Sequence, residues 1–387
     1  MTDGFARGTT PVQFREINWI RGALQTAIAL EHSTMPLYSA AMYSLEVQNY
    51  PAYNAIRSVL MEEMLHMAAA CNILAALGGS PRLKELHPGF PVTGLPGCVA
   101  PDLRCVLAPL SAAQLRNFMR IEAPRFMLAA AQQNVPYPTV GSFYEAIRAA
   151  VIGNAAAVRS AVADGGPANQ VGGNLGYRSI TRGRSADPVD EIIQAIDMIT
   201  EQGEGGAGRD LRASQTSQNE TSHYARFAEL HYRRRYVAPS PASAAGLSHE
   251  TAEDCFRGEE LAWPVVINTL AVPADGYAAI LARDPESASV SQELKSFDAA
   301  YTAMMVALDD AWNGPIERSW PSLGEAVIQM NEMRVLSCFN IMRHPVPDEV
   351  IAQLRQIYPQ EHALMAAHTD LTRPVFYGPR FDNMAAR

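Results

Sequence analysis

Acidic residues and histidines occur inside apolar helical sequence in the first part of the chain. Glu31 directly follows four apolar residues, and Glu63 and His66 lie in the apolar stretch VLMEEMLHMAAACNILAAL. Residues three apart project from one face of a helix. Burying a carboxylate or an imidazole there is costly unless the group is paired or bound to a metal ion. These three residues therefore indicate a buried metal site.

The same pattern continues further along the chain. Glu122 lies in the segment NFMRIEAPRFM, and Glu220 precedes His223 by three positions where a helical pattern begins. The order Glu, Glu-x-x-His, Glu, Glu-x-x-His is the ligand series of carboxylate-bridged dimetal sites in four-helix bundles. We therefore expect two metal ions, held by Glu31, Glu63, His66, Glu122, Glu220 and His223.

Two neighbours of these residues are interpreted differently. Glu62 lies four positions before His66, whereas the dimetal pattern requires three, so we interpret it as solvent-facing or as a partner of the ligands. His32 lies beside Glu31 but on another face of the helix, and it is interpreted as structural.

The spacing of apolar residues predicts the helices that would position this site. They are expected at about residues 14–47, 52–77, 111–133, 142–152, 187–202, 219–236, 287–312, 321–343 and 347–357. Pro36 is expected to kink or break the first helix, which forms an antiparallel hairpin with the second. The Pro- and Gly-rich residues 81–109 are expected to form a long crossover with a short strand at 104–107. The fold class is all-α.

A linker-like stretch at residues 238–246, APSPASAAG, suggests a division of the chain. We expect a helical bundle at residues 14–236 and a C-terminal helical extension at residues 247–387 that packs on the bundle.

Composition excludes several classes of partner. The net charge of -9 gives no electrostatic basis for binding nucleic acid. No apolar run reaches the roughly 18 to 20 residues of a membrane span, and residues 1–13 lack the layout of a signal peptide. Five scattered cysteines without a CxxC pair indicate a reducing compartment, so a cytoplasmic protein without disulfides or structural zinc is expected.

Several segments together resemble a known family. They are LEHSTMPLYSAAMYS, IRSVLMEEMLHMAAACNILAALGGSP, PDLRCVLAPLSAAQLRNFMRIEAP, SFYEAIR, EQGEG and SHYARFAEL. The chain resembles the ferritin-like domain family related to iminophenyl-pyruvate dimer synthase, which occurs in violacein- and rebeccamycin-type pathways. The likeness covers residues 14–236 and continues more weakly to the C-terminus. It implies a ferritin-like four-helix bundle with additional C-terminal helices and a role in natural product biosynthesis.

The resemblance also offers an alternative ligand. The EQGEG motif contains Glu201 and Glu204, and Glu204 competes with Glu220 for the same place in the ligand series. A Gly-rich interruption before His223 is compatible with a bundle helix that is broken. Both residues remain candidates at this point.

Carboxylates with imidazoles suit iron first and manganese second. Iron would support an oxidase or oxygenase that uses dioxygen on an amino-acid-derived small molecule, in a pocket covered by the crossover and the C-terminal helices. The apolar wall of that pocket is expected from Met35, Tyr38, Met64, Met67, Phe118 and Phe126.

Three alternatives stay open. They are a dimanganese, catalase-like enzyme that disproportionates peroxide, a non-catalytic metal-binding or scaffold protein, and oxidative coupling of imines with auxiliary metals. A homodimer is compatible with an acidic helical bundle of this size, although no residue in the sequence marks its interface.

Overall fold

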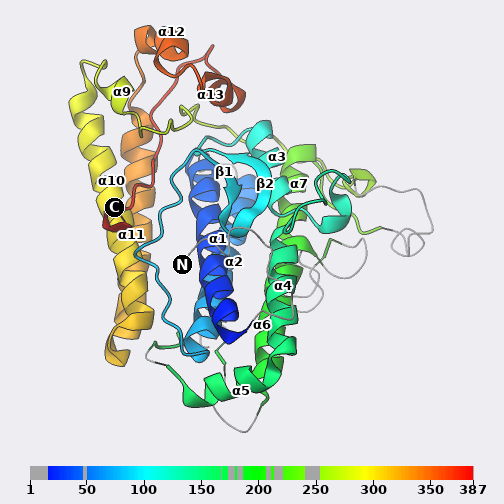
Figure 1. Cartoon of the computed structure of the whole chain (residues 1–387). Coiled ribbons are helices and arrows are strands. Elements are labelled where there is room, and N and C mark those ends of the chain that lie inside the picture. The colour runs from blue at the N-terminus through cyan, green and yellow to red at the C-terminus, as the bar shows by residue number, and fades with distance from the viewer. Residues whose placement is uncertain are drawn as a thin grey trace.

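In the computed structural model, which describes residues 16–46, 50–166, 168–172, 179–180, 186–205, 211–212, 221–239 and 253–386, two long helices form the centre. They are α1 (Ile17–Tyr43) and α2 (Tyr50–Ala76), packed side by side as the predicted antiparallel hairpin (Figure 1). The expected apolar positions of α1, among them Ile20 and Leu24, are fully buried.

Helix α1 continues past Pro36, so of the predicted kink or break the break is wrong and the kink stays a prediction. Proline cannot donate the backbone hydrogen bond of its turn. In the preceding turn, however, the hydroxyls of Ser33 and Thr34 donate to the carbonyls of Leu30 and Glu31. The residues around Pro36 are buried, so tertiary packing outweighs the missing bond.

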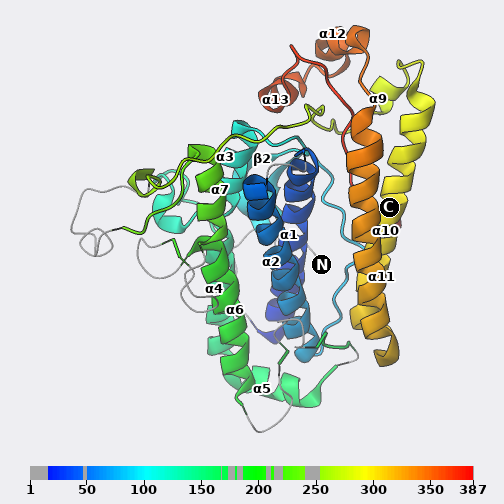
Figure 2. The ribbon, with the colours of Figure 1, turned by 180° about the vertical axis from the view of Figure 1, so that it is seen from behind.

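The third and fourth helices of the bundle each consist of two shorter helices. The third comprises α3 (Ala112–Ile121) and α4 (Val140–Gly153), and the fourth comprises α6 (Pro188–Glu204) and α7 (His223–Tyr232). Helix α3 packs against α7, and α4 packs against α6 (Figures 1 and 2). The two breaks therefore lie at the same level of the bundle.

The break in the third helix corrects the predicted continuous helix at residues 111–133. Helix α3 ends at Ile121, Glu122 is its C-cap, and a short 3-10 turn follows at Arg125–Met127. Pro124 explains the early end, because the residue before a proline disfavours the helical backbone conformation.

Capping residues fix the other helix ends that border the breaks. Thr139 and Ser142 form a reciprocal capping box at the start of α4. Asp187 caps α6, with Pro188 in the first turn. Ser222 accepts a hydrogen bond from the Ala225 amide, so α7 begins at His223 rather than near residue 219.

The crossover between α2 and α3 contains a small antiparallel β-hairpin of β1 (Val92–Leu95) and β2 (Val99–Cys105). Val92 pairs with Cys105 in its register. The predicted strand at 104–107 overlaps only the end of β2. Helix α5 (Ala155–Asp164) follows α4 directly, and the remaining 3-10 turns lie at Pro96–Cys98, Glu253–Cys255 and Met384–Ala386.

The C-terminal part is also helical. It comprises α9 (Ala278–Leu281), α10 (Ser287–Asn313), α11 (Ile316–Val335), a π-helical turn (Leu336–Asn340), a 3-10 turn (Ile341–Arg343), α12 (Asp348–Ile357) and α13 (His362–His368). Helices α10 and α11 form a hairpin beside α1 and α2 (Figure 2).

Side chains of α10 tie this hairpin to the bundle. The Tyr301 hydroxyl lies 2.8 Å from Nε2 of His32, and Trp312 Nε1 donates to Asn72 Oδ1 over 3.0 Å. His32 is thus a structural residue, as its position in the sequence indicated. The division of the chain into two units stays a prediction, and most of the expected linker lies outside the described residues.

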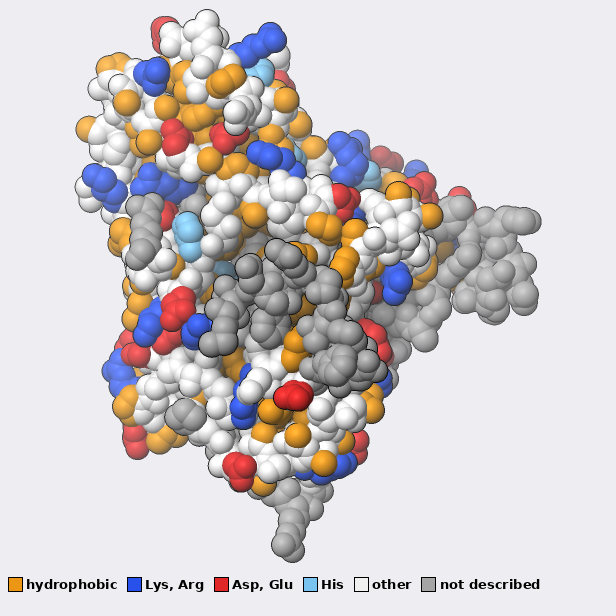
Figure 3. Space-filling model, viewed as in Figure 1, with side chains coloured by type: hydrophobic (Ala, Val, Ile, Leu, Met, Phe, Trp, Pro, Cys, Tyr) orange, Lys and Arg blue, Asp and Glu red, His pale blue; other side chains and the backbone are white. Residues whose placement is uncertain are grey.

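Segment Pro51–Ala76 of α2 is long and apolar enough to cross a bilayer, and the bent pair α4 and α5 passes the same test only when taken together. Within α2, 78% of the most apolar 18-residue window is buried inside the protein. Such burial is typical of a core helix of a folded protein. On the described surface seen in Figure 3, Lys and Arg side chains are interspersed with Asp and Glu side chains.

Candidate metal centre

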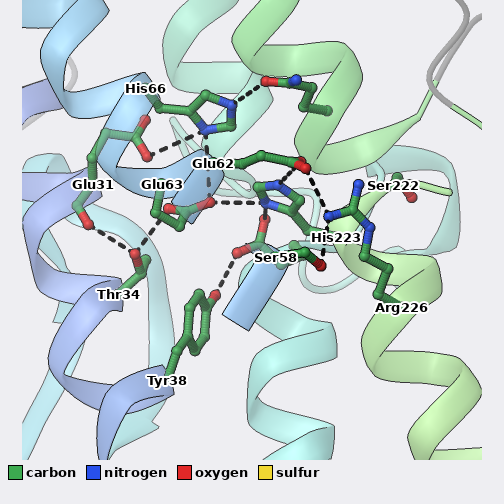
Figure 4. A network of polar contacts seen from close by, with 12 residues as sticks. Glu31, Thr34, Tyr38, Ser58, Glu62, Glu63, His66, Ser222, His223 and Arg226 are labelled. Carbon is green, nitrogen blue, oxygen red and sulfur yellow. Dashed lines mark hydrogen bonds and ion pairs between the residues drawn. The ribbon is translucent and has the colours of Figure 1, made fainter. Parts of the chain in front are cut away.

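Five of the residues predicted from the sequence meet inside the bundle (Figure 4). Glu31 comes from α1, Glu63 and His66 come from α2, Glu122 caps α3, and His223 begins α7. Their exposed fractions lie between 0% and 4%. Because both broken helices end at this level, residues from four helices converge on one buried point.

Glu63 lies between the two imidazole rings. Its Oε1 atom is 2.8 Å from Nδ1 of His223 and 3.6 Å from Nδ1 of His66. Oε2 of Glu31 is 3.9 Å from the His66 Nδ1 atom, and Oε2 of Glu122 is 3.5 Å from the His223 Nδ1 atom. One ligand atom from each of Glu63, His66 and His223 lies within 4.8 Å of the others.

The outer nitrogen of each imidazole is held by an oxygen acceptor. Nε2 of His66 lies 2.7 Å from Oε1 of Gln202, and Nε2 of His223 lies 2.9 Å from Oε2 of Glu62. Amide and carboxylate oxygens only accept hydrogen bonds, so both Nε2 atoms carry a proton and donate it. This arrangement orients a metal-binding histidine and leaves its Nδ1 lone pair free to coordinate. Glu62 is therefore a partner of His223.

Three carboxylates share a second feature: a protein hydroxyl fixes one oxygen, while the other faces an imidazole. The donor and acceptor pairs are Tyr144 with Glu31 Oε1, Thr34 with Glu63 Oε2, and Tyr38 with Glu122 Oε1. The hydroxyls set the orientation of each carboxylate, and the oxygens that remain point toward the centre.

Glu204 also reaches this centre. It is the last residue of α6, and its Oε1 atom accepts the Gly141 amide proton over 2.9 Å. Together with Glu31, Glu63, His66 and Glu122 it lines one cavity. Burial raises the pKa of Glu204 to about 7. Glu220 lies outside the described residues, so the structure places only Glu204 at the site.

The electrostatics of the cluster favour a cation. Burial and the negative charge of Glu63 raise the pKa of Glu31 well above its usual value. Burial alone would lower the pKa of His223, but Glu122, Glu62 and Glu63 raise it well above the usual range. Burial would likewise raise the pKa of Glu63, yet His223 and His66 bring it below the usual range. A positive charge, either a proton or a metal ion, is stabilised between these groups.

The donor set fits two divalent metal ions. His223 Nδ1 is buried and makes no hydrogen bond, although a carboxylate oxygen lies 2.8 Å away. A lone pair facing an oxygen at that distance is repulsive unless a proton or a metal ion shares it. Four carboxylates and two imidazoles match the type and number of ligands that hold two ions in four-helix bundles. Glu204, however, lies on a different helix segment from His223 and not three residues before it.

The cavity is small and differs from the predicted substrate pocket. Its volume is about 10 Å³, which is room for one water-sized molecule. Its apolar wall comes from Leu30, Val140 and Ile199. Of the residues expected there, Phe126 is 47% exposed, and Phe118 packs against Tyr38 in the core.

The residues that hold the ligands in place were not predicted in that role from the sequence, and Tyr38 was expected only as part of an apolar wall. Thr34 and Tyr38 lie in the motif LEHSTMPLYSAAMYS, and Tyr144 lies in SFYEAIR. The signal that the sequence offered for these partners was a hydroxyl-bearing side chain inside each of the two motifs. Arg226, which donates to Glu62 Oε1 over 2.8 Å, carried a weaker one because it is a charged residue inside SHYARFAEL.

A Gly141→Ala variant tests the place of Glu204. A Cβ atom at Gly141 would lie 2.5 Å from Glu204 Oε1, so the carboxylate must move away. We expect metal binding about 10- to 100-fold weaker, the range found when the surroundings of a metal ligand are disturbed. Metal content after dialysis against a graded chelator measures the change.

Gly153→Ala is the matched control, because it lies on the same helix and its Cβ would meet nothing within 4 Å. Metal binding should stay at the wild-type level. Glu204→Gln should reproduce the Gly141→Ala result, whereas loss in Glu220→Gln alone would show that Glu220 is the ligand. Equal retention in both Gln variants would mean five protein ligands or a role for Glu201.

The chain is similar to known proteins of one fold. A family model described as ferritin-like matches residues 24–232, which are 209 of the 387 residues. A solved structure of a ferritin-like protein from Caulobacter vibrioides is similar, with 22% identity and a TM-score of 0.56. The match covers 83% of this chain and 94% of that chain, and at this identity it shows the fold alone. No curated protein matches the chain.

Proposed function

This chain belongs to the ferritin-like family, and from that premise we propose that it is a non-haem dimetal oxidase or oxygenase, with iron ahead of manganese. One observation carries the proposal. Each of three buried carboxylates has one oxygen fixed by a hydroxyl and the other turned toward an imidazole Nδ1 atom. Such fixed orientation of the ligands supports a catalytic centre, because catalysis depends on precise positioning of the reacting groups.

The residues of the chain divide the work of such a centre. Two iron ions, held by Glu31, Glu63, His66, Glu122, Glu204 and His223, would supply electrons to dioxygen. The tyrosine hydroxyls of Tyr38 and Tyr144 keep the carboxylates in place. Nearly complete burial of the site excludes bulk water, which protects reactive species from side reactions.

A polar network supports His223 from behind. Arg226 donates to Glu62 Oε1 over 2.8 Å and to Ser58 Oγ over 3.0 Å, and Glu62 accepts from His223. Burial alone would raise the pKa of Glu62, but His223 and Arg226 lower it to about 2. The carboxylate therefore stays ionised at neutral pH and holds the imidazole in one orientation.

The substrate class rests on weaker support. The motifs that resemble the family of iminophenyl-pyruvate dimer synthase favour an amino-acid-derived small molecule and natural product biosynthesis. None of the five described cysteines forms a disulfide bond, which supports the proposed reducing, cytoplasmic location. The small cavity means that an organic substrate would bind at its edge or after side chains move.

The ligand set supports a second candidate function. Four carboxylates and two imidazoles would equally serve a dimanganese, catalase-like enzyme that disproportionates peroxide. The ligand types also suit manganese.

Metal content and turnover, measured on one preparation, distinguish these functions. We expect about two irons per chain in protein purified without added metal. Oxygen uptake should depend on reductant and be absent in a His66→Ala variant. Two manganese ions with rapid, reductant-independent peroxide turnover would instead establish the second candidate. Bound metal without either activity would show a metal-binding or scaffold protein.

A further inference from the structure

Helix α11 presents two apolar faces. One face packs on α10 through residues that include Leu323, Ala326 and Met333. The other carries large apolar side chains that are open to solvent, beginning with Ile316 at 61% exposed and Trp320 at 56% exposed. A helix that needs only one partner has one apolar stripe, so the second stripe of α11 requires an explanation.

The exposed stripe runs along the whole helix and into the π-helical turn that follows it. Its members are Ile316, Trp320, Val327, Ile328, Val335 and Phe339. At roughly 150–250 Å² for a large side chain, the six expose on the order of 600 Å² of apolar surface. That is at the upper limit for a monomer and approaches the ~800 Å² that each partner buries in a stable complex.

The order of residues in the stripe is symmetric about its centre. Consider an antiparallel pairing of two α11 helices that is centred between Val327 and Ile328. Val327 of each copy then faces Ile328 of the other copy. Trp320 then faces Val335, and Ile316 faces Phe339. Gly324, where an added Cβ would meet nothing within 4 Å, lies beside Trp320 and leaves room for a bulky neighbour. Self-complementarity of this kind is the requirement for a two-fold dimer.

The charges near the stripe agree with an antiparallel pairing. Glu317 and Arg318 lie at its N-terminal end, where Arg318 pairs with Glu325 over 3.3 Å. Glu332, Arg334 and Arg343 lie toward its C-terminal end, which is net positive. An antiparallel partner brings Glu317 of one helix toward the net positive end of the other. The opposed helix dipoles add to this complementarity.

We propose that the exposed stripe of α11 binds the same stripe of a second copy of this chain, in an antiparallel two-fold dimer. The hairpin of α10 and α11 lies at one side of the molecule, with α11 nearer the bundle than α10 in both views (Figures 1 and 2). The proposal does not depend on the metals or on the reaction.

An Ile328→Glu variant of the full chain tests the dimer. Light scattering after size exclusion should give the wild type a mass near 84 kDa, twice the 42.1 kDa of one chain. Two glutamates would be buried at the dimer centre, so we expect the dissociation constant to rise at least about 100-fold. The variant should therefore run as a 42.1 kDa monomer with unchanged helical signal and metal content.

Ile152→Glu is the matched control, since Ile152 is 48% exposed on α4, far from the stripe, and this variant should remain a dimer. A wild type that is monomeric at about 50 µM would overturn the proposal, whether its own residues 1–15 or a membrane covers the stripe. So would an Ile328→Glu variant that keeps the wild-type mass. Trp320→Lys and Val335→Glu should each weaken the dimer alone and restore it when combined, because these two positions face each other only in an antiparallel pair. Failure of the double variant to recover the dimer would overturn the antiparallel arrangement.

Discussion

A Glu63→Ala variant is expected to bind less than about a tenth of the metal that the wild-type chain binds. Glu63 Oε1 lies within 3.6 Å of both imidazole Nδ1 atoms, so its loss removes the one carboxylate that both histidines share. Loss of a ligand should exceed the 10- to 100-fold cost of disturbing its surroundings. Helical content should be retained, because alanine is the best helix former. Elemental analysis and circular dichroism of the same sample measure both quantities.

A graded set of variants accompanies this test. His66→Ala should lose metal to a similar extent, whereas Glu62→Ala should weaken binding by only about 10-fold, because Glu62 contacts His223 through the outer nitrogen. Glu145→Ala, at an exposed position of α4, should have no effect. Full metal content in both Glu63→Ala and His66→Ala would show that the cluster is not a metal centre.

The positions of most candidate ligands could be predicted because their signal is local. An acid or histidine inside an apolar helical run, such as Glu31 or His66, must be buried wherever that helix packs. The relation of Glu63 to His66 depends only on helix geometry. Tertiary structure was needed to show that these separate signals meet at one point.

The break in the third bundle helix could not be predicted from periodicity, whereas the sequence did predict two separate helices in the fourth. The apolar pattern around Glu122 continues past Pro124, but the backbone restriction before the proline ends α3 at Ile121. Conversely, α6 runs through Gly203, a residue that costs about 1 kcal/mol in a helix. Gly203 is buried, and a Cβ there would lie 3.5 Å from Glu122 Oε2, so a small residue fits the site. Glu204 thereby reaches the metal centre from a helix end.

The two faces of α11 show a further limit of sequence reasoning. The sequence predicts a helix near residues 321–343, but both faces of that helix carry apolar residues. Only the position of α10 shows which face is buried in the chain and which one, with Ile328 at 64% exposed, remains for a partner.

A Trp312→Ala variant is expected to lower the free energy of unfolding by about 3–5 kcal/mol, the usual cost of removing a buried aromatic side chain. Trp312 is 1% exposed at the end of α10, and its Nε1 donates to Asn72 Oδ1 on α2. The side chain thus joins the C-terminal hairpin to the bundle core. Urea unfolding, with the slope of the transition compared between variants, measures the loss.

Two further variants distinguish packing from general effects of tryptophan removal. Trp312→Phe keeps most of the packing and should cost about 1 kcal/mol for the lost hydrogen bond, since Asn72 Oδ1 still accepts from the Val171 amide. Trp263→Ala, at a position 38% exposed, should cost clearly less than Trp312→Ala. If Trp312→Ala instead splits unfolding into two transitions, the C-terminal helices form a unit of their own that Trp312 couples to the bundle. A loss below about 1 kcal/mol without such a split would mean that this contact does not hold the hairpin in place.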